Sequence, residues 1–178
     1  FAGHGLFRPF EPLESALLLA GQDRLSLEDL LAGKVSFASA RLAVMCACRS
    51  ANVGGHRLPD EVLGLPTGLL LAGVPGVVGT MWPVEERASA IFSVRFYEEM
   101  SGCDDPLVAV AATQRWLRDA TAPAHMPSVE AMRASILPSD TAASKALSRV
   151  WRDLASRPPD ERPFASPVYW AAFAYVGT

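Results

Sequence analysis

Two runs of apolar residues constrain the fold of this chain more than any other feature of its sequence. The first is "RLAVMCA", residues 41–47, and the second is "GVVGTMW", residues 76–82. Neither run alternates apolar with polar side chains, so each is expected to be buried on both faces. This pattern is typical of central parallel strands that helices cover on either side.

Helix signals lie between and after these two runs. In "SLEDLLAG", Asp29 stands three residues after Ser26, the spacing of a capping box, and a glycine closes the segment. A second helix is expected in "PTGLLLAG", with Pro66 near its start. A third is expected in "DDPLVAVAATQRWLRDA", with Asp104 or Asp105 as its cap.

The longest expected helix is "EERASAIFSVRFYEEM", because its apolar side chains recur on one helical stripe. The stripe consists of Ala88, Ile91, Phe92, Phe96 and Met100. Strand character is also expected in "SALLLAG" and in "VYWAAFAYVG". Strand and helix signals therefore alternate, which predicts an α/β layered domain with a largely parallel sheet.

The sequence changes in character between residues 121 and 167, where Pro, Ala and Ser are frequent. One helix is expected there, in "TAASKALSRVWRDLA", and the following "SRPPDERPFASP" is not expected to form regular structure. We therefore predict an insertion or a flexible flap over 121–167, within one domain that spans 1–178.

Composition argues against several classes of function. With 178 residues, half of them hydrophobic, the chain can bury one core, and its formal net charge of -3 provides no basic surface for nucleic acid. Gly and Pro break its apolar runs and no signal segment opens it, so no membrane contact is expected and the cytoplasm is the expected compartment. Zinc-type cysteine spacing, a dinucleotide fingerprint and a P-loop are all missing from the sequence, so no metal or cofactor is expected. The missing initiating Met suggests a piece of a longer protein.

The end of the first apolar run contains two cysteines, one of which is the candidate for a reactive thiol. Ligands meet parallel sheets at the carboxyl ends of strands. Cys46 lies within the run, where a thiol covered by helices behaves as a small inert hydrophobe. Cys48 lies where the run gives way to polar residues, so Cys48 is the candidate nucleophile. Cys103 lies in an expected loop and is given no role.

A reactive thiolate needs a base or a cation beside it, and the chain has three histidines. His4 stands in "FAGHG", an apolar lead-in followed by Gly, which is typical of a strand end that turns close to a ligand. His56 lies in a Gly-rich loop, and His125 lies in the expected insertion. His4 is the preferred partner of Cys48, although on this evidence a purely structural role for both residues stays open.

Several motifs, in a fixed order, resemble those of the CHAT family of caspase-like cysteine proteases, which is related in fold to caspases and separases. They are "FAGHG", "LAVMCACRSA", the segment 59–100 that begins "PDEVLG", and "PVYWAAFAYVGT". The match covers nearly the whole chain apart from 121–166. It implies an α/β, three-layer caspase-like domain with a largely parallel sheet flanked by helices, truncated at its N-terminus.

The resemblance also implies catalytic roles. It places Cys48 on the family's nucleophile, and His4 with Gly5 on the family's His-Gly pair. His4 would then be the general base toward Cys48 and the general acid to the leaving amine. The backbone N–H groups of Gly5 and Cys48 would form the oxyanion hole. No third, orienting carboxylate is assigned.

The family's Trp-x-Val-x-Asp motif is matched by Trp82, Val84 and Glu86, with Glu in place of Asp. In separases the matching acid faces a substrate arginine, so the resemblance implies a substrate-binding role for Glu86 and Trp82 and cleavage after a basic residue. The alternative for Glu86 is a charge in the first turn of the next helix, favoured by the helix dipole. Trp82 fits a core position equally well.

Three functions remain open on the sequence. The preferred one is a cysteine endopeptidase with a protein or peptide substrate, regulated by attached domains or a partner protein. The second is an inactive caspase-like scaffold used for protein binding, which the truncated start and the unusual Arg49 leave open. The third is another cysteine hydrolase, such as an amidase.

Overall fold

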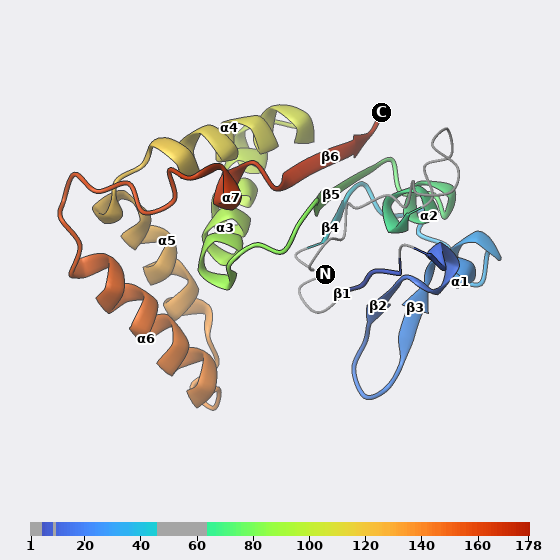
Figure 1. Cartoon of the computed structure of the whole chain (residues 1–178), viewed down its shortest axis with the longest axis horizontal. Coiled ribbons are helices and arrows are strands. Elements are labelled where there is room, and N and C mark those ends of the chain that lie inside the picture. Colours follow the sequence, from blue (N-terminus) through green and yellow to red (C-terminus); the bar gives the residue numbers. More distant parts are fainter. Residues whose placement is uncertain (1–4, 9, 46–63) are drawn as a thin grey trace. The chain divides into compact units, whose positions relative to one another are not determined.

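The computed structural model describes residues 5–8, 10–45 and 64–178 of a mixed α/β chain (Figure 1). The chain divides into two compact units. Residues Phe1–Val84 together with Ala172–Thr178 form the first, called the sheet unit here, and residues Glu85–Ala171 form the second, the helical unit.

The sheet unit begins with an antiparallel sheet in the order β1-β2-β3. Its strands are β1 (Gly5–Leu6), β2 (Ala16–Leu18) and β3 (Arg24–Ser26), and a 3-10 turn at Pro12–Glu14 precedes β2. Leu6 pairs with Ala16, and Leu17 pairs with Leu25. Only a few residues join β2 to β3, and so short a connection permits antiparallel pairing alone.

Helix α1 (Leu27–Leu31) starts at the capping box that the sequence predicts. The Asp29 backbone N–H donates to the Ser26 hydroxyl over 3.1 Å, and the Ser26 backbone N–H donates to the Asp29 carboxylate over 3.1 Å. Two otherwise unpaired donors of the first turn are thereby satisfied. The prediction of this helix and of its start is confirmed.

The second sheet of this unit has the order β4-β5-β6. Strand β4 (Ala43–Val44) runs parallel to β5 (Gly76–Thr80), and β6 (Phe173–Gly177) runs antiparallel to β5. Every residue of β5 is buried, as its apolar run predicts. Gly76 has no room for a side chain, because a Cβ there would lie 2.5 Å from the Tyr175 hydroxyl oxygen.

The expected largely parallel sheet is not what the described residues form. They contain one parallel pair of strands, β4 with β5, while the other pairs are antiparallel. The apolar run of β5 predicted burial correctly, but burial on both faces does not specify the direction of the neighbouring strand. The described chain is therefore a mixed α/β structure with two small sheets.

Helix α2 (Leu65–Leu71) connects β4 to β5 and packs on α1, and Pro66 stands in its first turn as predicted. The close packing depends on Gly68, where a Cβ would lie 2.6 Å from Leu27 Cδ1. A single apolar core joins these helices to both sheets. Its buried members are Leu17, Leu27, Leu30, Met45, Leu65, Leu69, Ala72, Val74 and Val77.

The helical unit consists of α3 (Glu86–Gly102), α4 (Pro106–Asp119), α5 (Ala122–Ser135), α6 (Thr141–Ala155) and the short α7 (Pro167–Trp170). Four of the five members of the predicted stripe on α3 are buried, namely Ala88, Ile91, Phe92 and Phe96. Met100 is half-buried. Asp105 caps α4 by accepting from the backbone N–H of Leu107 over 2.9 Å.

Helix α6 and the irregular chain after it agree with the sequence, but α5 was not predicted. Its sequence carries Pro123 in the first turn and Pro127 inside the helix. A proline in a helix interior removes a backbone hydrogen bond, so this sequence does not by itself predict a helix. The helix forms nevertheless, with buried side chains that include His125 and Val129. "VYWAAFAYVG" likewise begins as α7 before it becomes β6.

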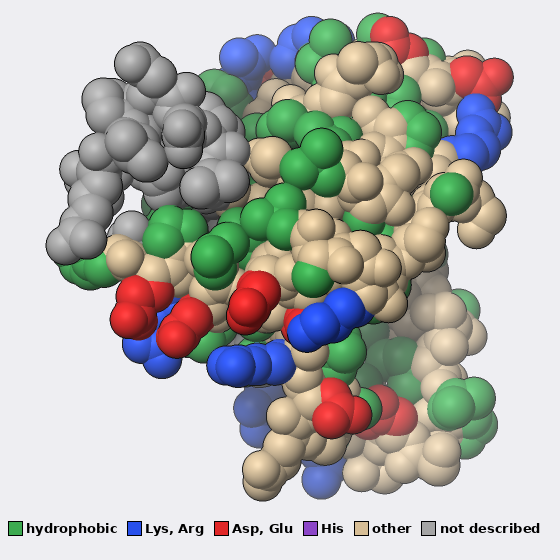
Figure 2. Space-filling model, turned by 90° about the vertical axis from the view of Figure 1, so that its right-hand side faces the viewer, with side chains coloured by type: hydrophobic (Ala, Val, Ile, Leu, Met, Phe, Trp, Pro, Cys, Tyr) green, Lys and Arg blue, Asp and Glu red, His purple; other side chains and the backbone are tan. Residues whose placement is uncertain are grey.

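Surface charge is mixed on the face that Figure 2 shows, where acidic and basic side chains lie near one another among hydrophobic and polar ones. In the described part of the chain, no helix has both the length and the apolar character that crossing a bilayer requires.

Candidate active site

The parallel pair of strands leads directly into the predicted nucleophile segment. The Met45 backbone N–H donates to the Val78 carbonyl over 2.8 Å, which extends the pairing of β4 with β5 by one residue. Met45 is buried, and Cys46 follows it in the sequence. Because both strands run in the same direction, their carboxyl ends meet at one edge of the sheet. Cys46 and Cys48 themselves lie outside the described residues.

The carboxyl end of β5 carries the other predicted motif. Thr80 ends the strand and is buried, and the Met81 backbone N–H donates to the Ala172 carbonyl over 2.8 Å. Trp82 follows and is half-buried. Trp82 therefore follows β5 at the edge of the sheet where β4 also ends. Its role in substrate binding stays a prediction.

Gly5 is the described member of the predicted His-Gly pair. It is half-buried and is the first residue of β1, where it pairs with Leu17. Within the described residues, no strand pairing joins β1 to β4. His4 lies outside the described residues, as does His56.

Two neighbouring carboxylates at the start of α3 have different surroundings. Glu85 is the N-cap residue of α3, and its side chain forms an ion pair with the Arg87 guanidinium instead of capping the helix. Glu86 is the first residue of the helix and is exposed. No hydrogen bond or ion pair to its carboxylate is found among the described residues. Glu86 is thus the one of the two that can receive a cation.

Sequence reasoning missed an ion-pair network that includes Arg87. Arg87 Nη1 lies 2.7 Å from Asp153 Oδ2 on α6, and Arg157 Nε donates to the same oxygen over 3.1 Å. Arg157 Nη1 also donates to Glu161 over 2.5 Å. The spacing of Asp153, Arg157 and Glu161 by four residues each is a readable signal. The link from Arg87 to Asp153 spans 66 residues and has no local signal.

His125 lies in the core of the helical unit. It is fully buried, with its ring centroid 4.7 Å from that of Trp116 and 5.0 Å from that of Phe164. Burial lowers the pKa of His125 to about 4, and the backbone of Ala120 opposes part of that shift. The imidazole is therefore neutral near pH 7 and has a packing role in the described structure.

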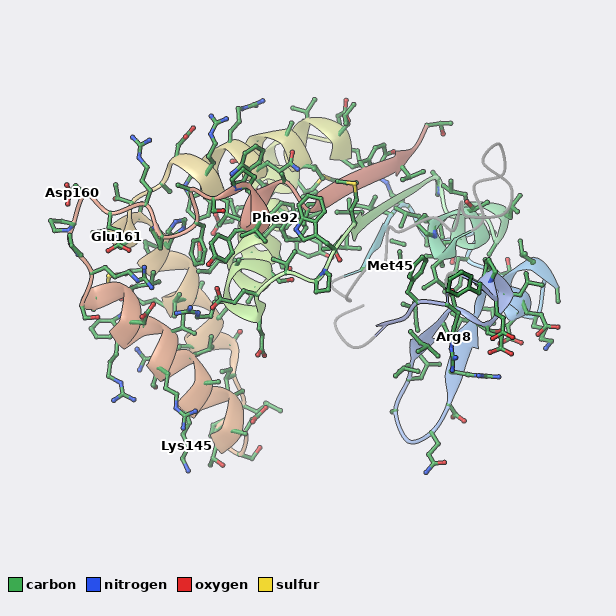
Figure 3. All side chains as sticks on the ribbon, in the orientation of Figure 1. Arg8, Met45, Phe92, Lys145, Asp160 and Glu161 are labelled. Atoms are coloured by element: carbon green, nitrogen blue, oxygen red, sulfur yellow. The ribbon has the colours of Figure 1, made fainter. Side chains whose placement is uncertain are left out.

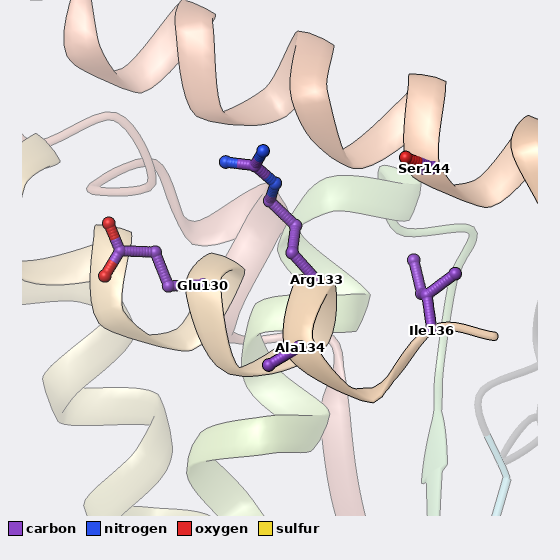
Figure 4. Close-up of a pocket in the computed structure, with 5 residues that line it drawn as sticks. All are labelled: Glu130, Arg133, Ala134, Ile136 and Ser144. Carbon is purple, nitrogen blue, oxygen red and sulfur yellow. The ribbon is translucent and has the colours of Figure 1, made fainter. Parts of the chain in front are cut away.

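A cavity of about 330 Å³ opens between α5 and α6 (Figure 4). Glu130 and Arg133 project from α5 at its rim, and Glu130 also accepts from the Trp151 indole N–H over 3.3 Å. The complete lining is Glu130, Arg133, Ala134, Ile136 and Ser144. None of these is a site residue that the sequence predicts. Among the described residues, no cluster of three or more His, Cys, Asp or Glu could hold a metal ion.

Comparison with known proteins identifies the family of the chain. The model of the CHAT domain matches residues 1–178, the whole chain, including the stretch 121–166 that the motif resemblance left out. No curated protein matches the chain. With a parallel strand pair that leads into the nucleophile motif and a family match over its full length, the chain belongs to the CHAT domain family.

Proposed function

We propose that this chain is a cysteine endopeptidase that uses Cys48 and His4 as a dyad and cleaves a protein substrate after a basic residue. The CHAT domain is a caspase-like family, and the mixed α/β structure is consistent with a protease-like fold. The observation that carries the proposal is the pairing of β4 with β5. Their shared carboxyl edge continues into Cys46–Cys48 from one strand and into Trp82 from the other.

The chemistry follows from the residue types. His4 takes the thiol proton, and the Cys48 sulfur forms a bond to the peptide carbonyl carbon. When the C–N bond breaks, His4 returns the proton to the leaving amine, and a water then hydrolyses the thioester. Backbone N–H groups of Gly5 and Cys48 stabilise the negative oxygen of each tetrahedral intermediate.

Preference for a basic residue rests on Glu86. Its exposed carboxylate is unpaired among the described residues, while its neighbour Glu85 is already neutralised by Arg87. An arginine side chain binds a carboxylate through two parallel hydrogen bonds, which a lysine cannot do. We therefore propose arginine as the preferred residue before the scissile bond. A substrate-binding role is also proposed for Trp82.

Attached domains or a partner protein would regulate this activity in the proposed scheme. An inactive scaffold that binds proteins, and a different cysteine hydrolase such as an amidase, are the alternatives to it. The experiments below distinguish both alternatives from the proposed endopeptidase. A scaffold has no reactive thiol, and an amidase does not cut within a peptide.

Replacing each cysteine in turn tests the nucleophile. We expect Cys48→Ala to lower kcat for peptide cleavage by a factor of at least about 10³, because the covalent step loses its nucleophile. Cys46→Ser should keep most of the activity. The measurement is cleavage of an arginine-containing peptide library, together with labelling by an irreversible peptide-ketone probe.

The labelling pattern provides the control. Probe attachment at Cys48 should require His4, so His4→Ala should abolish labelling while Cys103 stays unlabelled in every variant. Labelling of Cys46 in place of Cys48 would overturn the assignment. Labelling without any cut within a peptide would favour the amidase, and a complete lack of labelling would favour the scaffold.

Changing the charge of Glu86 tests the specificity. Glu86→Gln should lower kcat/KM for an arginine peptide about 10- to 100-fold, because an arginine loses its charged acceptor. Glu86→Arg should lower it further and improve relative cleavage of a matched aspartate peptide. Glu98→Gln, on the same helix, is the matched control. If all variants cut arginine peptides equally well, Glu86 is only a helix-dipole charge.

A further inference from the structure

We propose that Asp153, on α6, is a positioning residue that sets how strongly Glu86 attracts a basic substrate side chain. It does so by binding Arg87, the cation next to Glu86 in the sequence. This inference rests on the proposed substrate-binding role of Glu86. It assigns a role in specificity to the segment 121–166, which the motif resemblance does not cover.

The contacts of Arg87 carry the first step. Its guanidinium binds Glu85 on one side, and its Nη1 donates to Asp153 Oδ2 over 2.7 Å on the other. Neither acceptor is Glu86, whose carboxylate has no partner among the described residues. Glu85 binds Nε and Nη2 of Arg87, and Asp153 is the acceptor for Nη1. Without Asp153, Nη1 would lose this acceptor.

The second step of the inference concerns the charges that neutralise Arg87 beside Glu86. Glu85 and Asp153 both pair with Arg87, and Asp153 also pairs with Arg157. Glu86 is the neighbour of Arg87 in the sequence. Removing the charge of Asp153 would leave Arg87 less neutralised, one residue from Glu86. Because the pair is partly exposed, we expect this change of charge near Glu86 to alter the Kd of a bound cation by about fivefold and not by more.

The same network ties the α5–α6 hairpin to this position. Arg157 links Asp153 to Glu161, and the Glu161 carbonyl accepts from the Ala122 backbone N–H over 2.8 Å at the start of α5. Figure 3 shows Glu161 on the chain segment that follows α6. Both ends of the hairpin are therefore connected to the acceptor of Arg87, all within the helical unit.

A purely stabilising role is the competing explanation for this network. The side chains of Arg87 and Asp153 are 34% and 38% exposed, and ion pairs with that much solvent contact contribute little to stability. We therefore expect Asp153→Asn to fold normally, which permits a test of substrate binding. Asp153→Glu, which keeps the charge, is the conservative control.

Binding of an arginine peptide that cannot be cleaved tests the inference without relying on turnover. The probe carries a reduced bond after arginine, and a citrulline peptide of the same shape but without charge is its matched control. We expect Asp153→Asn to raise the Kd of the arginine peptide about fivefold and to leave the citrulline peptide unchanged. Asp153→Glu should bind as the wild type does.

A double-mutant cycle shows whether Asp153 acts through Arg87. Arg87→Gln should lower the Kd of the arginine peptide, and in that background Asp153→Asn should change it less than about twofold. In turnover, Asp153→Asn should raise KM and leave kcat unchanged, because the attraction is lost equally from the bound substrate and from the transition state.

The possible failures are distinguishable. Asp153→Asn could raise the Kd of the arginine peptide and of the citrulline peptide by the same factor, or could have the same effect in the Arg87→Gln background as in the wild type. In either case Asp153 is merely structural and the inference is wrong. If the wild type binds arginine better than citrulline but Asp153→Asn does not change this, the inference alone fails. If the wild type has no preference for arginine, both the specificity of Glu86 and this inference fail, while the assignment of Cys48 is decided separately by labelling.

Discussion

At the scale of single residues, His125 is an ionisable side chain placed where a charge is costly. Trp116 and Phe164 contact its ring edge-to-face, and neither ring nitrogen has a hydrogen-bond partner among the described residues. The ring is buried, so the protonated imidazole would lose its hydration, and the backbone of Ala120 would offset only part of that loss. This explains the direction of its pKa shift.

The shift predicts how stability depends on pH. The pKa of His125 is about 4 in the folded chain and 6.5 for the free side chain, so the unfolded chain takes up the proton first as the pH falls. The contribution of His125 to the free energy of unfolding should therefore be constant above about pH 7. It should decrease as the pH falls from about 6.5 to 4. The total loss is at most about 3 kcal/mol.

Urea unfolding at several pH values measures this effect. His125→Phe keeps an aromatic ring at the position but removes its proton equilibrium, so the variant should lose less stability than the wild type between pH 7 and 4. Parallel unfolding curves for the two proteins over that range would contradict the prediction, because the decrease would then come from other groups.

At the scale of secondary-structure elements, the α5–α6 hairpin shows how local signals can mislead. Its two helices pack on each other, and α5 also packs on α3. Asp140 caps α6 by accepting from the Ala143 backbone N–H over 2.9 Å. The prolines of α5 obscured a helix that packing stabilises, since tertiary contacts override a weak local preference.

The predicted insertion or flap over 121–167 includes this hairpin. Leu137, in the connection between α5 and α6, is 71% exposed, and most of the residues of 156–163 are exposed or half-buried. We expect limited proteolysis with a protease of broad specificity to cut first within 121–167, at these connections, because regular hydrogen bonding does not protect them. Fragment masses would locate the cuts.

The core of the helical unit serves as the internal reference in that experiment. Helices α3 and α4 bury large side chains and should survive the first cuts. A first cut between Ser26 and Val84, ahead of any within 121–167, would contradict the prediction.

At the scale of the whole molecule, the sheet unit is built from separate parts of the chain. Residues Ala172–Thr178 return after the helical unit and supply β6, which pairs with β5 from Gly76↔Gly177 to Thr80↔Phe173. The helical unit is thus inserted in sequence between two neighbouring strands. The sequence predicted strand character in both β5 and β6, but the order of the elements along the chain did not reveal this arrangement.

The sequence alone was sufficient for features that depend on residues close together along the chain. The capping box of Ser26 and Asp29, the stripe on α3 and the burial of β5 were all predicted, because a cap or a helical face involves side chains within about four residues of one another. The motifs that place the chain in the CHAT family belong to the same category.

Only the tertiary structure decided the features that join distant segments. The direction of β6, the burial of His125 and the link between Arg87 and Asp153 each depend on chain that is far away in sequence. The distinction between Glu85 and Glu86 is of the same kind. The two are adjacent and chemically identical in the sequence, and only the fold brings α6 close enough to hold Arg87 and leave Glu86 without a described partner.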